Sequence, residues 1–146
     1  MNKKSQQFLS GHVLNIILAV LVLIVIFGFL VVKVYGMYQD KSNLEKAKGS
    51  LNNFIMDFDN FIKGTETQKE FMITGPEGWY VLFYEKDYTL PKACEGYDYC
   101  ACICDGDDSA ECDKSGVCAQ LKNKWQWRDE YKIDQIPYTI KVTKNG

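Results

Sequence analysis

The sequence VLNIILAVLVLIVIFGFLVV, residues 13–32, decides the architecture of this chain. None of these twenty residues is charged, and Asn15 is the only strongly polar one. At a rise of about 1.5 Å per residue, a helix of this length spans roughly 30 Å, the thickness of the hydrocarbon core of a bilayer. We therefore expect a transmembrane helix over residues 13–34, preceded by a cytoplasmic leader at residues 1–12.

A cleaved secretory signal peptide is the main alternative for this segment, because Lys3 and Lys4 supply the positive charges with which such signals begin. The apolar core of a signal peptide is normally only about 7–15 residues long and ends at a cleavage site of small residues. Here the apolar run is longer, and no A-x-A-like site occurs in residues 29–35, where it ends. A retained signal anchor is the favoured interpretation.

The flanking charges and the cysteines disagree about the orientation of this helix. Positive charges normally mark the cytoplasmic side, yet more lysines follow the span than precede it: Lys33, Lys41, Lys46 and Lys48. All six cysteines lie between residues 94 and 118. An even, clustered set in a small domain is typical of disulfides formed in an oxidising compartment. We give the cysteines more weight and expect the C-terminal domain to be extracytoplasmic.

Residues 35–64 continue the helix with an amphipathic pattern. Apolar residues recur at spacings of three and four, the period of one helix face: Leu44, Ala47, Leu51, Phe54, Phe58 and Phe61. No proline interrupts residues 13–63, so we expect one nearly continuous helix of about 75 Å that ends at Gly64. A coiled coil has a similar spacing, but three phenylalanines on the seam favour packing beneath the chain's own C-terminal domain.

Residues 65–146 have the pattern of a β-sheet domain. Short β-rich runs at residues 71–74 and 79–84 flank a Gly-Pro-Glu-Gly turn and predict a β-hairpin. Further strands are expected near residues 99–104, 116–121 and 138–143. The predicted fold class is α+β, with a long N-terminal helix, transmembrane and then amphipathic, packed on a small antiparallel sheet of four or five strands.

The cysteines follow the spacing C-x5-C-x-C-x-C-x7-C-x5-C, the most specific pattern in the chain: Cys94, Cys100, Cys102, Cys104, Cys112 and Cys118. If the three central cysteines lie on one strand, successive Cα atoms are about 6.6 Å apart, near the upper limit for a disulfide. Each is then expected to pair with one of the other three, which reduces the fifteen possible connectivities to six. We expect three structural disulfides.

Metal and redox sites are the alternatives for these cysteines. Zinc sites usually contain C-x2-4-C knuckles, and thiol redox enzymes use C-x-x-C. The C-x-C-x-C run differs from both, and the single histidine, His12, lies at the edge of the predicted span. Structural disulfides with no cofactor and no bound metal are therefore favoured.

Two stretches carry side chains of the kind that bind ligands. The carboxylates of Asp105, Asp107, Asp108 and Glu111 are candidate calcium ligands, but the loop lacks the glycine and the final acidic residue of an EF-hand loop. A solvated loop is favoured there. Aromatic residues also alternate next to a positive charge, as on a surface that stacks on a ligand or lipid headgroup: Trp125, Trp127 and Arg128. Packing in the core is the favoured alternative for these tryptophans.

Charge and composition argue against two functional classes. Residues 65–146 contain ten Lys and Arg against fifteen Asp and Glu, a net charge of −5, whereas nucleic-acid-binding proteins draw most of their affinity from Lys and Arg. The same residues include no histidine, and no spacing of carboxylates or lysines suggests acid–base catalysis. We expect neither nucleic-acid binding nor an enzyme.

The whole plan resembles type IV pilins and pilin-like proteins, and also small archaeal envelope proteins. Lys3 and Lys4 followed by Gly11, directly before the apolar run, are similar to a class III leader that is cleaved after Gly11. A helix that is first apolar and then amphipathic, a β-sheet domain and C-terminal cysteines extend the resemblance over most of the chain. His12 follows that glycine, and Ile16 occupies the position where the family usually has glutamate.

These observations predict a single-pass, non-enzymatic protein of the cell envelope, with a cytoplasmic N-terminus and an extracytoplasmic C-terminal domain. Its expected partners are membrane lipid and either other membrane helices or copies of itself, as the resemblance to a surface assembly implies. A membrane-tethered module that binds a ligand or calcium is the alternative, and a metal or redox protein is the third.

Overall fold

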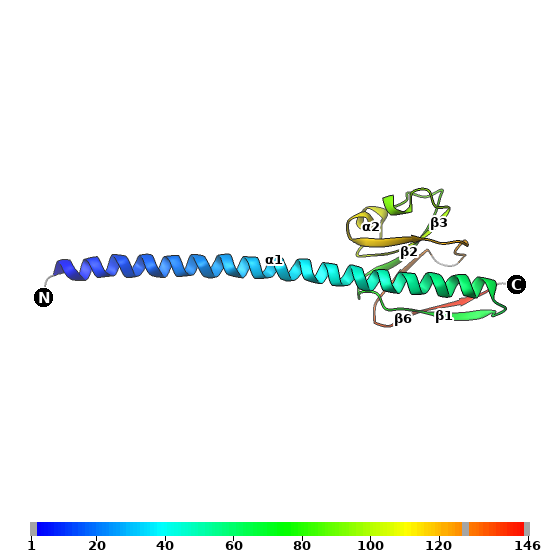
Figure 1. Ribbon diagram of the computed structural model, residues 1–146, viewed down its shortest axis with the longest axis horizontal. Coiled ribbons are helices and arrows are strands. Elements are labelled where there is room, and N and C mark those ends of the chain that lie inside the picture. The colour runs from blue at the N-terminus through cyan, green and yellow to red at the C-terminus, as the bar shows by residue number, and fades with distance from the viewer. Residues whose placement is uncertain (1–2, 127–128, 145–146) are drawn as a thin grey trace. The chain divides into compact units, whose positions relative to one another are not determined.

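The computed structural model describes residues 3–126 and 129–144, and the chain divides into two units, Met1–Gln39 and Asp40–Gly146 (Figure 1). Helix α1 (Lys3–Lys63) forms the first unit and continues into the second, which we call the head domain. The described part of the head domain adds six strands, the 3-10 helix η1 (Lys92–Cys94) and helix α2 (Ser109–Ser115). The predicted α+β fold with three disulfides is confirmed.

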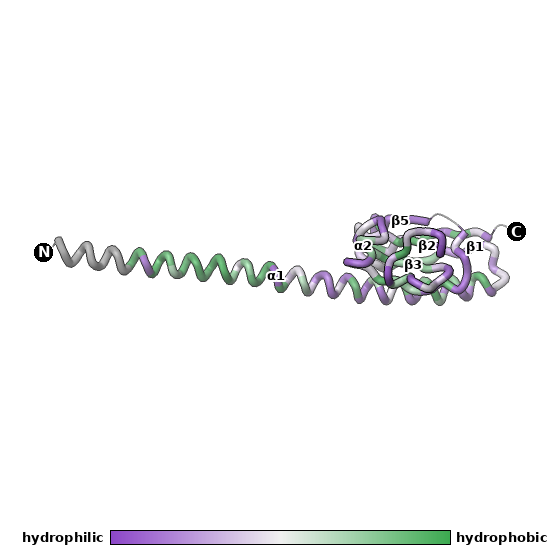
Figure 2. The backbone as a smooth tube through the Cα atoms, turned by 90° about the horizontal axis from the view of Figure 1, so that it is seen from above, coloured by the Kyte–Doolittle hydropathy of each residue, from purple (hydrophilic) through white to green (hydrophobic). Residues whose placement is uncertain are grey.

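Between residues 13 and 32, apolar side chains surround α1 on all sides. This stretch is almost entirely green in Figure 2, and its large apolar residues are all exposed, from 49% at Val20 to 72% at Val32. A helix that is apolar all round is stable only where other apolar groups cover it. By length and composition, α1 is the one described helix able to cross a membrane.

In the head domain, the apolar stripe of α1 is buried. Leu44 is partly buried against the core, and the other five residues of the predicted stripe are each at most 2% exposed: Ala47, Leu51, Phe54, Phe58 and Phe61. This burial confirms that the stripe packs beneath the chain's own sheets. Residues 40–63 therefore belong to the same compact unit as the strands, because they contribute one wall of its core. At the helix end, the Gly64 N–H donates to the carbonyl oxygens of Asn60 and Phe61.

Two antiparallel sheets enclose this part of α1. One has two strands, and its order is β1 (Gln68–Ile73), β6 (Tyr138–Thr143). The other has four, and its order is β4 (Gly116–Gln120), β3 (Tyr99–Cys104), β2 (Tyr80–Glu85), β5 (Glu130–Lys132). In Figure 1, β1 and β6 lie along one side of the helix, and β2, β3 and α2 lie along the other.

The predicted hairpin of residues 71–74 and 79–84 is wrong. Strand β1 pairs with β6, with Phe71 opposite Ile140, whereas β2 pairs with β3 and β5. The connecting residues carry the chain from one sheet to the other: a Cβ at Gly75 would lie 3.0 Å from Ile133 Cδ1, and the Gly78 N–H donates to the Ile133 carbonyl at 2.8 Å. The turn signal was correct, but contacts with a distant segment determine which strands pair.

An aromatic cluster joins α1 to both sheets. The Phe54 ring lies 5.3 Å from Phe71 of β1 and 5.6 Å from both Phe83 of β2 and Trp125, measured between ring centroids. Because one helix side chain contacts both sheets, the sheets and the helix share a single core.

Candidate functional site

The six cysteines form a sulfur layer on one face of β3. The disulfides are Cys94–Cys100, Cys102–Cys118 and Cys104–Cys112, one of the six expected connectivities. Cys102 and Cys118 are directly opposed in the β3–β4 register. As predicted, the three cysteines on β3 do not bond one another, because alternate residues of a strand are too far apart.

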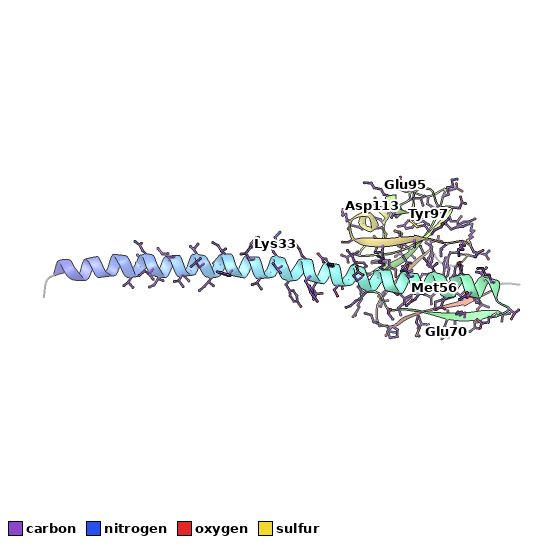
Figure 3. The ribbon with its side chains drawn as sticks, in the orientation of Figure 1. Lys33, Met56, Glu70, Glu95, Tyr97 and Asp113 are labelled. Atoms are coloured by element: carbon purple, nitrogen blue, oxygen red, sulfur yellow. A yellow bond between two sulfur atoms is a disulfide. The ribbon has the colours of Figure 1, made fainter. Side chains whose placement is uncertain are left out.

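The alternation of β3 explains why this strand is buried on both faces. Ala101 and Ile103 face the core beneath α1, whereas Cys100, Cys102 and Cys104 face a second apolar cluster that also contains Leu82. Helices η1 and α2 contribute Cys94 and Cys112 to this second layer. It lies at the side of the head domain where Figure 3 labels Tyr97 and Asp113. The disulfides thus provide a small second core.

Sulfur atoms of different disulfides also lie close together. Cys94 Sγ is 3.5 Å from Cys102 Sγ, and the Tyr84 hydroxyl is 3.7 Å from Cys112 Sγ. Two sets of four cysteines have all of their Sγ atoms within 4.8 Å of one another: Cys94, Cys100, Cys102 and Cys118, and Cys102, Cys104, Cys112 and Cys118. In the described chain, every cysteine is oxidised.

Residues of the candidate calcium loop make hydrogen bonds and an ion pair within the head domain. Asp108 caps α2 by accepting a hydrogen bond from the Glu111 N–H at 2.8 Å, and Glu111 forms an ion pair with Lys114 at 2.6 Å. Asp105 donates its backbone N–H to the Ser115 carbonyl. Within the described residues, the only groups of potential metal ligands that converge are the cysteine sets. The carboxylates of Asp105, Asp107, Asp108 and Glu111 do not form a calcium cage in this structure.

Two of these carboxylates instead border a cavity of about 360 Å³. Its lining includes Tyr84, Tyr88, Asp107, Asp108, Asp129 and Glu130. Burial raises the pKa of Tyr84 to about 12, and the negative charges of Asp108 and Asp107 add to this effect. The cavity therefore combines aromatic surface with a negative potential, a combination suited to small cations. Sequence reasoning missed Tyr84. The available signal was the alternation that places Tyr80, Leu82 and Tyr84 on the face of β2 that packs against the cysteines.

Trp125 lies in the core, as the favoured interpretation of its sequence pattern expected, rather than on a surface that could stack on a ligand. Its side chain is only 4% exposed and stacks on Phe83 with centroids 4.1 Å apart and the planes 6° from parallel. The core alternative applies, because a large indole fills the space between Phe54, Phe58 and Phe83. The other two residues of that prediction, Trp127 and Arg128, lie outside the described residues.

A buried carboxylate on α1 was not anticipated. Asp59 is 7% exposed, and its Oδ2 lies 3.0 Å from Nζ of Lys122, which follows β4. Its Oδ1 has no hydrogen-bond partner among the described residues. The contact ties the loop after β4 to the helix, and nothing in the local sequence around Asp59 distinguishes it from a surface aspartate.

The exposed surface of α1 in the first unit is the other candidate site. Aromatic and aliphatic side chains lie along one stretch of it: Phe27, Leu30, Val31, Val34, Tyr35 and Tyr38. Tyr35 accepts a hydrogen bond from the Gln39 amide through its hydroxyl, at 3.1 Å. Tyrosines at the end of an apolar helix are typical of the interface between hydrocarbon and headgroups.

The chain matches no model of a protein family, no curated protein and no solved structure. Its function is therefore inferred from the arrangement of its own residues.

Proposed function

We propose that the protein is a membrane-anchored, non-enzymatic subunit of the cell envelope, whose head domain lies outside the cytoplasm and whose apolar helix packs against copies of itself in a pilin-like surface assembly. One observation carries the proposal: a helix that is apolar on every side continues directly into a domain cross-linked by three disulfides.

The disulfides support the location of the head domain. Disulfides persist in extracytoplasmic compartments and are rare where thiol reductants are abundant. With the head domain outside, the membrane helix places Lys3 and Lys4 on the cytoplasmic side. The lysines that follow the span favour the opposite orientation, because positive charges normally mark the cytoplasmic side. We give more weight to the six oxidised cysteines.

The exposed helix supports assembly. No residue from 13 to 32 is ionisable, and the apolar side chains face outward around the entire helix. Lipid can cover such a surface, and so can neighbouring helices of the same kind. The single polar residue of the span, Asn15, can hydrogen-bond across a helix–helix contact in a membrane, where such bonds favour association.

The topology is tested by the intact mass of the protein from its native membrane, alkylated without reduction. A mass without adducts supports three disulfides and an extracytoplasmic head domain, and loss of residues 1–11 in the same spectrum supports pilin-like processing. Six adducts would place free thiols in a reducing compartment and overturn the proposed orientation.

Assembly is tested by a photoreactive amino acid at Leu23, which lies in the middle of the apolar surface. We expect irradiation of intact cells to give a ladder of homo-oligomers. The same amino acid at Met56, an exposed position on the head-domain part of α1, is the matched control for nonspecific capture. Adducts with lipid alone would leave a membrane anchor and refute assembly through the helix.

A second candidate function rests on the cavity beside α2. Its tyrosines and carboxylates suit a small organic cation, so the head domain would be a tethered binding module. Calorimetry with choline and with spermidine tests this idea against an Asp107→Asn, Glu130→Gln variant. Heat of binding that disappears in the variant would favour this function over a purely structural head domain.

A further inference from the structure

Four sulfur atoms from three structural elements converge beside β3. Cys94 ends η1, Cys100 and Cys102 lie on β3, and Cys118 lies on β4. All four Sγ atoms lie within 4.8 Å of one another, although only the pairs Cys94–Cys100 and Cys102–Cys118 are bonded. The unbonded contact between Cys94 Sγ and Cys102 Sγ is 3.5 Å.

These distances approach those of a tetrathiolate metal site. Zinc binds thiolate sulfur at about 2.3 Å in a tetrahedron, so neighbouring sulfur atoms are about 3.8 Å apart. The unbonded pair Cys94 and Cys102 already lies near that separation at 3.5 Å, and the other unbonded pairs lie within 4.8 Å. The two bonded pairs must move apart after reduction. The β3–β4 register fixes the backbone positions of Cys102 and Cys118. Their sulfur atoms therefore move apart by rotation of the side chains.

We propose that Cys94, Cys100, Cys102 and Cys118, once reduced, bind one thiophilic divalent cation such as Zn²⁺ or Cd²⁺ as a tetrathiolate site. Each disulfide takes two electrons and two protons from a dithiol, which is itself oxidised to a disulfide. The cation then displaces the four thiol protons and forms a complex with a net charge of −2. In the reverse direction, two external disulfides accept four electrons and four protons and become dithiols, both protein disulfides form again and the cation is released. The disulfide and metal-bound states therefore exclude each other.

The alternative set, Cys102, Cys104, Cys112 and Cys118, is less suited to this role. Cys112 Sγ lies beside Tyr84, where the negative charges of Asp107, Asp108 and Asp113 act, and these charges oppose a dianionic complex. Cys104 Sγ is also confined by backbone, because a Cβ at Gly116 would lie only 2.8 Å from it.

Burial and access also favour the chosen set. Cys94, Cys100 and Cys102 are each at most 1% exposed, which shields a complex from solvent. Cys118 is only partly buried and lies on β4, an edge strand of the four-stranded sheet, so it provides a route for the reductant and the cation. The inference is independent of any assembly through α1, because every ligand belongs to the head domain.

The test uses the full chain in detergent, reduced with a water-soluble phosphine and titrated with Co²⁺ without oxygen. Tetrahedral thiolate coordination gives Co²⁺ intense visible absorption bands, and we expect them to saturate at one ion per chain and to disappear on addition of Zn²⁺. Near-UV circular dichroism of the Trp125–Phe83 stack reports whether the core is folded before and after the titration.

Two double variants identify the ligands. Cys104→Ser with Cys112→Ser leaves the proposed set intact, and we expect it to keep the full absorption of the unmodified chain. Cys94→Ser with Cys100→Ser removes two ligands, and we expect it to lose these bands. Absence of the bands from the first variant, or equal bands in both, would overturn the assignment. Folding of the reduced chain only when Co²⁺ is added would support it.

Discussion

Truncation of Phe54 tests whether helix α1 is an integral part of the head-domain core. The ring is 1% exposed and lies 5.3–6.0 Å from four other aromatic rings, those of Phe58, Phe71, Phe83 and Trp125. Phe→Ala substitutions in cores cost about 3–5 kcal/mol, because apolar contact is lost and a cavity remains. With both sheets contacting this one ring, we expect Phe54→Ala to cost about 4 kcal/mol.

The assay is urea unfolding of the purified full chain in detergent, followed by near-UV circular dichroism. With a denaturant slope of about 2 kcal/mol/M, the midpoint should fall by about 2 M. Met56→Ala, on the exposed side of the same helix at 59% exposure, should change the free energy of unfolding by no more than about 0.5 kcal/mol. Equal shifts in the two variants would show that α1 is not packed beneath the sheets.

Three other changes probe the second core, the buried carboxylate and the cavity. Replacing both Cys102 and Cys118 by Ser should lower the free energy of unfolding by about 3 kcal/mol, more than removal of either other disulfide, because this bond closes the longest loop, with a separation of 16 residues. If chemical denaturation shows a smaller loss of stability for this variant than for removal of the other disulfides, the ranking is refuted. Lys122→Ala should destabilise the head domain by about 1–3 kcal/mol, because it leaves buried Asp59 without its ion pair. In the same denaturation assay, the double variant Lys122→Ala, Asp59→Leu should be more stable than Lys122→Ala alone. The pKa of Tyr84 is raised to about 12, so the native state holds this phenol proton more tightly than the unfolded state, and the free energy of unfolding should fall as pH rises from 10 to 12. Tyr84→Phe should reduce that fall in urea titrations. An unchanged pH dependence in the variant would show that Tyr84 does not cause the fall.

The sequence alone predicted the features that depend on local pattern. An uninterrupted apolar run from residue 13 to residue 32 identifies a helix that can cross a membrane, because length and hydropathy need no tertiary contact. The three- and four-residue spacing of Leu51, Phe54 and Phe58 predicted the buried face of α1 for the same reason. Alternation on β3 further excluded disulfides among Cys100, Cys102 and Cys104.

Tertiary structure decided the features that depend on residues far apart in the chain. Strand β1 pairs with β6, which begins 65 residues after β1 ends, and no local signal distinguishes this partner from β2. The choice of one disulfide connectivity from six, the burial of Trp125 and the cavity beside Tyr84 likewise follow from which segments pack together. Periodicity shows which face of an element is apolar, whereas the surface that covers that face is determined by packing of the whole domain.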